Sequence, residues 1–516
     1  MKKLLILIFM VFLIFILVGC VSANELGVEN EAAAATPIPT TPYPALTTPP
    51  QALAGNATGI SAGAHHTLAL LDDNTLWAWG SGTRWGWNEG SLIGDGTNEN
   101  RPSPVKIMEN IASATACISH SLAIDNDGVL WAWGNNVMGQ LGDGTSYSRY
   151  APVRIMDDVR YAVIAPSEEM SHVAYSSRSF AIRYDNSLWA WGSWWDESED
   201  FRWFDIPGYL GDGGAHGSRE PVMIMENVAY VAPTLFGGYA ITTDGVLWGW
   251  GRFSRSWEAN SVLYPVQIME NIALVHSNLN TAFAITNDAA LWLLGPEPRW
   301  LKDDVIFATG DTAIFFAITS DNTLWAWGRN RLPDHWRPGP PLGDGTTVDR
   351  EEPVKIMENV AHVYVLGNVA YAITLDGELW AWGNNGGALG SGIIGDGALF
   401  VWDDIEDHMW EFAYDYIDGH EIPSGIRWLL DNDGGAGLRL SPVLILENVV
   451  YVTANYSMFD HGWIRTFRTF ALTSCGSVWA WGENDDLKQG ASLLGDSTTE
   501  QRLSPVRIIG NNDAGD

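Results

Sequence analysis

The chain has 516 residues, a length that by itself would suggest three or more domains. Its 62 acidic residues outnumber its 28 basic residues, which gives a formal net charge of −34. A surface this acidic repels DNA and anionic lipid headgroups, so the composition argues against a nucleic-acid-binding protein and against electrostatic adsorption to a membrane.

The first segment, residues 1–19, has the features of an export signal. Lys2 and Lys3 precede an unbroken apolar run from Leu4 to Val18, as in a signal peptide. The next residues, Leu17-Val18-Gly19-Cys20, resemble the lipobox of bacterial lipoproteins. That resemblance implies cleavage before Cys20 and a lipid on its thiol, and the alternative is an uncleaved signal anchor. Both predict an exported protein attached to the extracytoplasmic face of the cell membrane, through this anchor only.

Residues 20–58 form a linker between the lipidated cysteine and the rest of the chain. Thr36–Pro44 and Thr47–Pro50 are dense in threonine and proline. Such segments cannot build a core, and their prolines favour an extended polyproline II conformation. We expect a semi-rigid spacer that holds the following domain away from the membrane.

One motif organises the chain from residue 59 to residue 510. Leu-Trp-Ala-Trp-Gly and its near copies recur eight times. A unit that recurs at this interval indicates a repeat architecture, which overrides the domain count suggested by length. The copies begin at Leu76, Leu130, Leu188, Leu247, Leu291, Leu324, Leu379 and Val478.

Each copy lies among short predicted strands. Pro221–Val231 and Tyr239–Trp248 are apolar runs rich in β-branched and aromatic residues, and Asp244-Gly245 divides the second run. Asp-Gly tolerates the positive φ of a tight hairpin turn. Within Leu-Trp-Ala-Trp, alternation places both Trp side chains on one face of the strand and Leu and Ala on the other. Both faces therefore need cover, as in the stacked sheets of a β-propeller.

The repeat resembles that of the regulator of chromosome condensation family, which forms a β-propeller. The resemblance rests on the Trp-Gly-Asn-Asn-x-x-Gly-Gln-Leu-Gly-Asp-Gly-Thr run at Trp133–Thr145, on the Pro-Val strand starts, and on Ser61–Thr67. It covers about Gly59 to Ile509.

The number of blades departs from the seven that are usual in that family. The Trp motif occurs eight times but the Pro-Val start only seven times, because the sixth unit, around Val305–Ile318, lacks the Pro-Val strand and the long loop. This unit has the pattern of a shortened blade. The sequence therefore predicts an all-β propeller of eight units, with seven blades as the alternative.

The two ends of the repeat region are predicted to close the ring. The last Pro-Val strand, which ends at Ile509, has no Trp hairpin after it, and the first Trp hairpin has no Pro-Val strand before it. The N- and C-terminal strands would then complete one blade between them, which removes open sheet edges. Residues 511–516 would be a short tail.

The sequence offers few residues for catalysis. His66 and His120 occupy one repeat position and have the pattern of packing or hydrogen-bonding residues. Gly59–Gly63 matches the nucleophile-elbow pattern but lacks its strand-to-helix context. Cys117 and Cys475 fall in different parts of different repeats, which predicts two separate thiols. We therefore expect a non-enzymatic protein.

The aspartates offer little for metal binding. The Gly-Asp-Gly runs at Asp95, Asp143, Asp212, Asp344 and Asp396, like Asp125–Gly128, are predicted turns. No cofactor is expected. A weak calcium candidate is the cluster of Asp403, Asp404, Glu406 and Asp407, because clustered carboxylates suit a hard cation.

Binding residues are expected in the loops between each Trp-Gly and the next Gly-Asp-Gly, which should gather on one face of the ring. Loops on a rigid scaffold commonly bind, and Trp, Tyr and Arg often anchor interfaces. The longest loop is an acidic, aromatic insertion at 396–433. The alternative is that these rings shield the loops' own interiors. The candidates are Trp85, Trp87, Trp194, Trp195, Trp203, Trp257, Arg329, Trp336, Arg337, Trp402, Trp410 and Tyr414.

The resulting hypothesis is a lipid-anchored, cell-surface scaffold that binds an extracellular or envelope protein through this loop face. The alternative is a module that binds cell-wall polysaccharide with loop Trp rings. Export, the lipid site and the acidity argue against the nuclear, chromatin-contacting role known in the family. Coplanar exposed rings in a groove would favour sugar, a mixed patch with Arg would favour protein, and converging His and carboxylates would favour an enzyme.

Overall fold

The structure is a computed structural model, and it describes most of the repeat region. The described residues are 53–82, 91–166, 178–193, 210–214, 216–252, 262–278, 281–310, 313–330, 341–366, 369–384, 438–459, 464–484 and 492–510. They form strands, turns and irregular connections, with no helix among them. Among these described residues there is therefore no helix that is long and apolar enough to cross a membrane.

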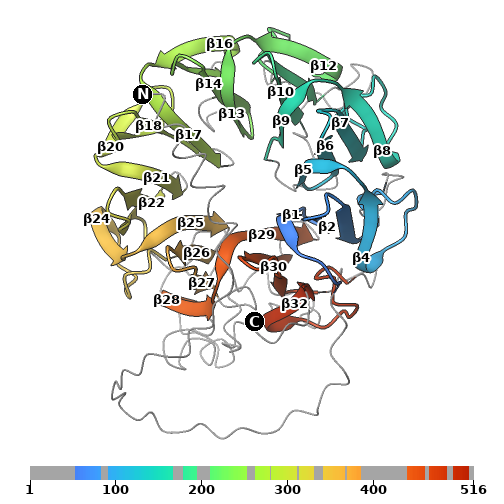
Figure 1. The fold of residues 1–516 in the computed structure, drawn as a ribbon. Helices are drawn as coiled ribbons and strands as arrows, with labels where there is room; N and C mark the ends of the chain where they lie inside the picture. Colours follow the sequence, from blue (N-terminus) through green and yellow to red (C-terminus); the bar gives the residue numbers. More distant parts are fainter. Residues whose placement is uncertain are drawn as a thin grey trace, which may run out of the picture.

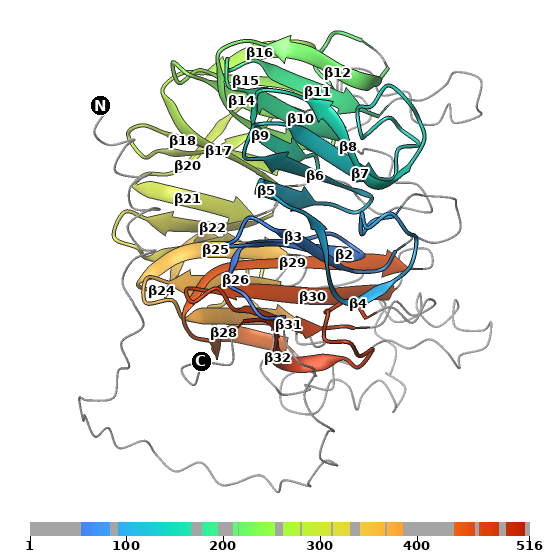
Figure 2. The same cartoon turned by 45° about the vertical axis from the view of Figure 1, so that its right-hand side comes forward.

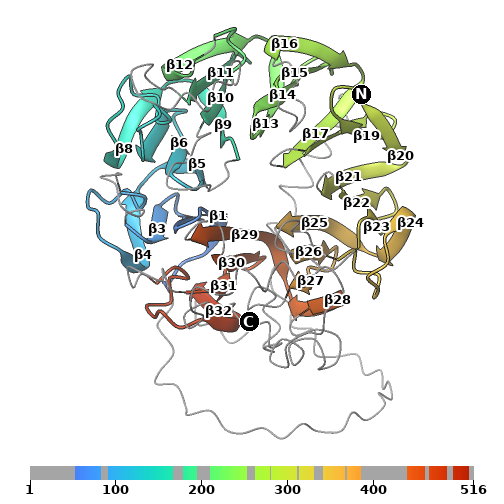
Figure 3. The same ribbon diagram turned by 180° about the vertical axis from the view of Figure 1, so that it is seen from behind.

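Eight four-stranded antiparallel sheets are arranged as blades around a central axis (Figures 1 and 3). In the turned view of Figure 2, neighbouring sheets lie face to face. This confirms the all-β, eight-bladed propeller and removes the seven-bladed alternative. Each blade consists of four consecutive strands, so blade 1 is β1–β4 and blade 8 is β29–β32.

The first strand of each blade lies nearest the axis, and the second pairs with it. The innermost strands are β1 (Ala57–Ala62), β5 (Ile111–Ala116), β9 (Val159–Ile164), β13 (Val228–Thr234), β17 (Ile272–Asn278), β21 (Val305–Gly310), β25 (Val360–Leu366) and β29 (Val449–Phe459). The second strands are β2 (His66–Leu71), β6 (His120–Asp125), β10 (Arg178–Arg183), β14 (Gly237–Thr242), β18 (Thr281–Thr286), β22 (Ile314–Thr319), β26 (Val369–Thr374) and β30 (Ile464–Thr473).

The third strand carries the Trp motif, and the fourth forms the outer rim of the ring. The third strands are β3 (Leu76–Gly80), β7 (Leu130–Gly134), β11 (Leu188–Gly192), β15 (Leu247–Gly251), β19 (Leu291–Leu294), β23 (Leu324–Gly328), β27 (Leu379–Asn384) and β31 (Val478–Gly482). The outermost strands are β4 (Arg101–Met108), β8 (Arg149–Met156), β12 (Ser218–Met225), β16 (Val262–Met269), β20 (Arg299–Lys302), β24 (Arg350–Met357), β28 (Leu438–Leu446) and β32 (Arg502–Ile509).

The alternation within the Trp motif decides which neighbour each side chain meets. In blade 1, Leu76 and Ala78 pack into the core shared with blade 2, beside Ile111. Trp79 packs into the core shared with blade 8, where its ring meets Phe470 edge-on at 6.0 Å. The prediction that both faces are covered is confirmed. Burial of this apolar surface between sheets is the main force that holds the ring together.

Tight turns of positive φ connect the strands. The predicted Asp-Gly hairpins hold Gly128 at φ 79°, Gly245 at φ 84° and Gly377 at φ 82°. A second class of turn, at the end of the Met-Glu-Asn sequence, joins each blade to the next. Its asparagines, such as Asn110 at φ 62° and Asn227 at φ 60°, tolerate the left-handed region better than most residues.

The ends of the ring meet, but not by sharing a blade. β32 is the outermost strand of blade 8, and β1–β4 already complete blade 1, so the predicted shared blade is wrong. The Pro-Val strand pairs with the Trp strand before it rather than starting the next unit. The ring closes instead by packing of blade 1 on blade 8, with a bridge from Leu53 to Ile509.

The shortened unit lies in blade 5 rather than blade 6. Its outermost strand, β20, has four residues, whereas β8 has eight. Only Gly295-Pro296-Glu297-Pro298 joins β19 to β20. The Pro-Val sequence that is absent before Val305 would have formed part of the outer strand β20. The covering loop that precedes this strand in other blades is absent too.

Candidate functional site

The loop after the third strand covers the Trp motif of the next blade. In blade 2 this covering loop, Asn135–Ser148, places Leu141 in the core between blades 2 and 3. Trp191 of blade 3 donates from Nε1 to the Gln140 carbonyl at 3.0 Å. Gly144 donates from its N–H to the Arg219 carbonyl of β12 at 3.0 Å. One loop thus buries an apolar side chain and satisfies two polar groups of its neighbour.

An aspartate fixes the shape of each covering loop. Asp143 accepts from the N–H and Oγ1 of Thr145 at 3.0 and 2.7 Å, and from Nε of Arg149 at 2.7 Å. Burial favours the neutral carboxyl, but the hydrogen bonds from Thr145 and Arg149 outweigh it and lower the pKa of Asp143. Asp95, Asp344 and Asp496 repeat the arrangement.

The predicted turns at Asp95, Asp143, Asp212 and Asp344 are confirmed, and Asp125 likewise accepts from the N–H of Asp127 in its hairpin. The arginine six residues after the aspartate was not predicted from the sequence. The recurring Gly-Asp-x-Thr-x-x-x-Arg spacing is the signal that could have shown it.

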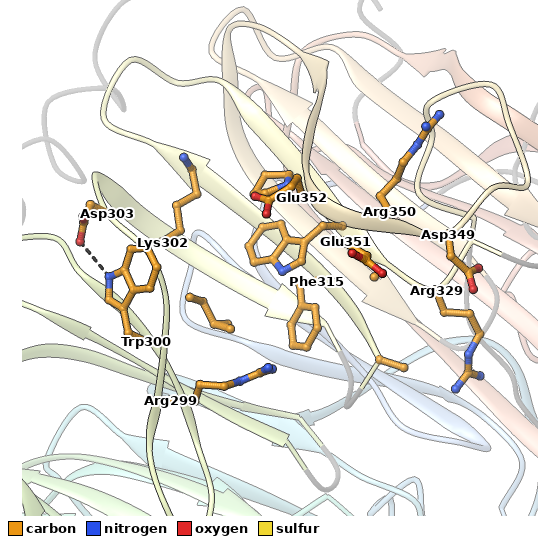
Figure 4. Close-up of a pocket in the computed structure, with 15 residues that line it drawn as sticks. Arg299, Trp300, Lys302, Asp303, Phe315, Arg329, Asp349, Arg350, Glu351 and Glu352 are labelled. Atoms are coloured by element: carbon orange, nitrogen blue, oxygen red, sulfur yellow. Dashed lines mark hydrogen bonds between the residues drawn. The ribbon is translucent and has the colours of Figure 1, made fainter.

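The junction between blades 5 and 6 has no covering loop, and a cavity of about 1020 Å³ opens there. We call it the blade 5–6 notch. It lies between β20 and β24, and its lining includes Gly328, where β23 ends and the loops of the predicted binding face begin. Its floor and rim include Arg299, Trp300, Lys302, Phe315, Trp327, Arg329, Glu351 and Glu352 (Figure 4).

Two stacked aromatic rings form the floor of the notch. Phe315 and Trp327 lie 5.5 Å apart at an interplanar angle of 21°. The position of Phe315 is occupied in the other seven blades by a small residue: Thr67, Ser121, Ser179, Gly238, Ala282, Ala370 and Thr469. Phe315 therefore takes up part of the space that a covering loop would fill.

Trp327 nevertheless stays less covered than its counterparts. It is 6% exposed, whereas Trp133 and Trp191 are 0% exposed. Its Nε1 donates to no described residue, while Trp133, Trp191 and Trp382 each donate to a covering-loop carbonyl.

The rim of the notch carries charges of both signs. Its four basic residues are Arg299, Lys302, Arg329 and Arg350, and its four acidic residues are Asp303, Asp349, Glu351 and Glu352. The positive and negative charges of the notch are therefore equal in number, although the acidic residues of the whole chain outnumber the basic ones by more than two to one. In the view of Figure 4, Phe315 is drawn between Arg299 and Arg329.

Some of these charges have partners and some do not. Arg350 pairs with Asp344, and the ammonium of Lys302 lies 5.1 Å from the Trp325 ring. Trp300 is 51% exposed and donates from Nε1 to Asp303 at 2.9 Å. Arg299 and Arg329 form no ion pair with any described residue. The notch therefore presents two arginines that have no ion pair with a described residue, beside a floor of two stacked aromatic rings.

Of the predicted binding residues, the structure describes only Arg329, which follows β23 and lines the notch. The remaining candidates lie outside the described residues: Trp85, Trp87, Trp194, Trp195, Trp203, Trp257, Trp336, Arg337, Trp402, Trp410 and Tyr414. Cys20 and the calcium candidates Asp403, Asp404, Glu406 and Asp407 also lie outside them. Arg299 and Trp300 were not predicted from the sequence, although Gly295–Pro298 in place of a long loop marks the site.

His66 and His120 connect neighbouring blades. Nε2 of His66 lies 2.7 Å from Ser121 Oγ, and Nε2 of His120 lies 2.9 Å from Ser179 Oγ. The pKa of each imidazole is lowered to about 3, mainly by burial, and for His66 also by the neighbouring His65 and His120. The hydrogen-bonding role predicted for both residues is confirmed.

Arg178 occupies the same repeat position and donates to the carbonyls of Thr234 and Leu235 in the next blade. Arg468 closes the ring at this position by donating to Ala64. Cys117 and Cys475 lie on blades 2 and 8 and share no disulfide, as predicted. Within the described ranges, no three His, Cys, Asp or Glu side chains are close enough together to hold a metal ion.

The fold and its repeated sequence define the class of protein. Residues 57–84 and residues 127–176 each match a model of the regulator of chromosome condensation (RCC1) repeat. The chain is thus an eight-bladed β-propeller in which two segments match the RCC1 repeat.

Individual relatives are distant. The chain is 26% identical to the ultraviolet-B receptor UVR8 of Arabidopsis thaliana over 207 residues, which are 38% of this chain and 41% of that protein. Yeast RCC1 (Prp20) bound to Kap60 is 16% identical with a TM-score of 0.48, over 94% of this chain and 92% of that one. Human WBSCR16 is 17% identical with a TM-score of 0.40, over 62% and 85%.

Proposed function

We propose that the protein is a non-enzymatic binding scaffold that holds another protein on its loop face, with the blade 5–6 notch as part of the site. The observation that supports this most is the mixed character of the notch. A rigid Phe315–Trp327 floor lies beside Arg299 and Arg329, which have no ion partner among the described residues, and beside Glu351 and Glu352. Aromatic and arginine side chains around a pocket are the usual anchors of protein interfaces.

The same composition favours protein over polysaccharide. Sugar binding by aromatic stacking calls for exposed ring faces in a shared plane. Of the aromatic residues that line the notch, only Trp300 is more than half exposed, and its indole N–H donates to Asp303. Polysaccharide binding remains the second candidate for the Trp-rich loops that lie outside the described residues.

The cellular setting of the proposal comes from the sequence. The signal segment of residues 1–19 and the lipobox-like Leu17–Cys20 support an exported protein with its lipid on Cys20. The Thr/Pro-rich linker would place the ring at some distance from the membrane. The partner would then be an extracellular or envelope protein, and the net charge of −34 argues against nucleic acid.

The test is a capture experiment with the full-length chain immobilised through a C-terminal tag. Envelope proteins and purified cell-wall polysaccharide are offered to the wild type and to Arg299→Glu/Arg329→Glu. The matched control is Arg154→Glu/Arg183→Glu, which changes two arginines on blades 2 and 3.

The expected result is capture of one discrete protein by the wild type and the control, and a loss of at least tenfold in the notch variant, because reversed charges repel a partner selected for these cations. Retention of polysaccharide alone would move the assignment to the second candidate. Equal capture of the protein by all three chains would exclude the notch from the site.

A further inference from the structure

We propose that the partner occupies the blade 5–6 notch with a loop that copies the covering loops of this ring: an apolar residue, then a glycine, then a main-chain N–H two residues later. This inference rests on the proposed function and specifies the recognised segment. One junction is open, whereas at five described junctions the chain supplies such a loop itself. Those covering loops carry Ile93-Gly94, Leu141-Gly142, Leu210-Gly211, Leu342-Gly343 and Leu494-Gly495.

The spacing within the covering loops is constant. In three of the five covering loops the residue before the apolar one accepts from the indole N–H of the next blade, as the Leu92 carbonyl does from Trp133 at 3.1 Å. The exception is Trp79, beside Leu494-Gly495, whose buried indole N–H has no hydrogen-bond partner among the described residues. The second residue after the glycine donates its N–H to the next outer strand, as Gly96 does to the Tyr150 carbonyl at 2.8 Å. Gly144, Gly213 and Ser497 donate in the same way to Arg219, Leu263 and Pro102.

The notch has the two groups that such a loop satisfies elsewhere. Trp327 Nε1 is the equivalent donor, and it has no acceptor among the described residues. The Glu351 carbonyl is the equivalent acceptor, because Glu351 follows Arg350 in β24 as Pro102 follows Arg101 in β4. No described residue of blade 5 donates to that carbonyl as Gly96 does to Tyr150. A donor and an acceptor at a fixed separation make the site specific for main chain.

The glycine is required by the indole face. A Cβ placed on Gly142 would lie 2.7 Å from Trp191 Nε1, and one on Gly94 would lie 2.6 Å from Trp133 Nε1. Both glycines also have positive φ, 81° and 89°. The same approach to Trp327 therefore excludes any residue with a side chain at this position of the partner's loop.

Phe315 sets the depth to which the partner can enter. Leu141 reaches the core between blades 2 and 3, where the residue equivalent to Phe315 is Ser179. At the notch, Phe315 already packs on Phe283 and Trp327. The partner's apolar side chain would rest on the Phe315 ring instead of entering between the blades. Such a shallow contact suits a reversible complex better than a permanent one.

The first experiment measures binding of a fluorescently labelled peptide with the sequence of residues 138–145, Met-Gly-Gln-Leu-Gly-Asp-Gly-Thr, to the full-length chain by anisotropy. We expect saturable binding that weakens at least tenfold for the peptide with Gly142→Ala. On the protein, Trp327→Phe keeps the ring but removes the N–H, and should weaken binding three- to tenfold. The control Trp189→Phe removes an indole N–H that bonds to Ser187, away from the notch, and should bind as the wild type does.

The second experiment fills the notch from within the chain. Residues 135–152 of blade 2 replace residues 296–298, which joins the covering loop to Gly295 and Arg299 in the register that blade 2 uses. The filled chain should lose at least tenfold in peptide affinity and should unfold at a higher temperature than the wild type. Unchanged affinity together with unchanged thermal unfolding would overturn the proposal.

The outcomes separate this inference from the proposed function. If the captured partner still binds the filled chain and the wild type does not bind the peptide, the proposal that the partner copies a covering loop is wrong, while the scaffold function stands. If the wild type forms a concentration-dependent dimer that filling the notch abolishes, the occupant is a second copy of this chain, and the assignment to a different protein is overturned. Loss of both the peptide and the captured protein on filling supports the proposal.

Discussion

The junction between blades 2 and 3 and the junction between blades 5 and 6 are built from the same strands but differ in one loop. At the first, Leu141 is buried and Gln140 accepts from the Trp191 indole. At the second, four residues replace the loop, and Trp327 faces a cavity of about 1020 Å³. In this ring the loop of one blade completes the core of the next blade, so that loss of the loop leaves an open cavity at the junction.

Phe315 shows how the chain tolerates that loss. An uncovered junction would expose apolar surface and weaken the ring. A large ring at a position that is small in every other blade restores part of the packing. Charged side chains line much of the remaining space, so the open junction does not expose a large apolar patch. Stability and an open site are thereby compatible.

The largest contrast is expected from removing the Trp at each junction. Trp191→Ala should lower the free energy of unfolding by about 4–5 kcal/mol, because it removes a fully buried ring and leaves the Leu141 loop without its anchor. Trp327→Ala should lower it by only about 3 kcal/mol, because the ring borders an open cavity instead of a covering loop. Urea denaturation followed by circular dichroism measures both. Equal losses would mean that the covering loop contributes nothing to the core.

The next largest effect is a pH dependence of stability at the covered junction between blades 2 and 3. Burial holds the pKa of His120 at about 3, below its ordinary 6.5, so the unfolded chain binds a proton in that interval and the folded chain does not. The stability contributed is fully present above pH 6.5 and is lost as the pH falls toward 3. Each such histidine should lower the free energy of unfolding by about 2 kcal/mol when the pH falls from 7 to 5.

At the open junction, Thr281 takes the position of His120 and cannot titrate. His120→Gln should therefore remove about 2 kcal/mol from the difference between the unfolding free energies measured at pH 7 and pH 5. Urea denaturation at pH 7, 6 and 5 checks this. An unchanged difference would show that His120 does not govern the acid sensitivity of this junction.

A smaller effect is expected from the aspartate that shapes the covering loop. Asp143→Asn should cost about 1–3 kcal/mol at pH 7, because it removes a charged acceptor from Thr145 and Arg149. The pKa of Asp143 is lowered in the folded chain, so this contribution is present above about pH 3.9 and disappears as the pH falls through the folded pKa.

Asp303→Asn, at the rim of the notch, is the matched control. Asp303 is exposed and accepts only from Trp300, so its loss should cost less than about 0.5 kcal/mol. Thermal unfolding of both variants at pH 7 provides the comparison. Similar shifts in the two would remove the distinction between a loop-shaping carboxylate and a rim carboxylate.

The smallest effect on stability is expected from Arg329→Ala. This side chain forms no ion pair with a described residue, so the free energy of unfolding should change by less than about 0.5 kcal/mol. Capture of the partner should nevertheless fall several-fold. A substantial loss of stability would assign Arg329 a structural role and weaken the proposed site.

The amino-acid sequence by itself determined the architecture of the ring. Alternation within Leu-Trp-Ala-Trp is a local property with a period of two residues, and eight copies of it predict eight blades. Asp-Gly at Gly128 and Gly245 predicts tight turns because positive φ is a local requirement too. The shared repeat position of His66 and His120 predicted a packing or hydrogen-bonding role, and the structure shows the hydrogen bonds.

Only the tertiary structure decided which surfaces the repeats share. That β32 belongs to blade 8, that the loop of one blade covers the Trp of the next, and that Trp327 has no such cover all depend on contacts between distant segments. The sequence marked the shortened unit but assigned its missing strand to the wrong blade. A strand pattern specifies which faces need a neighbour, whereas the packing of the closed ring specifies which neighbour supplies the cover and which face stays open.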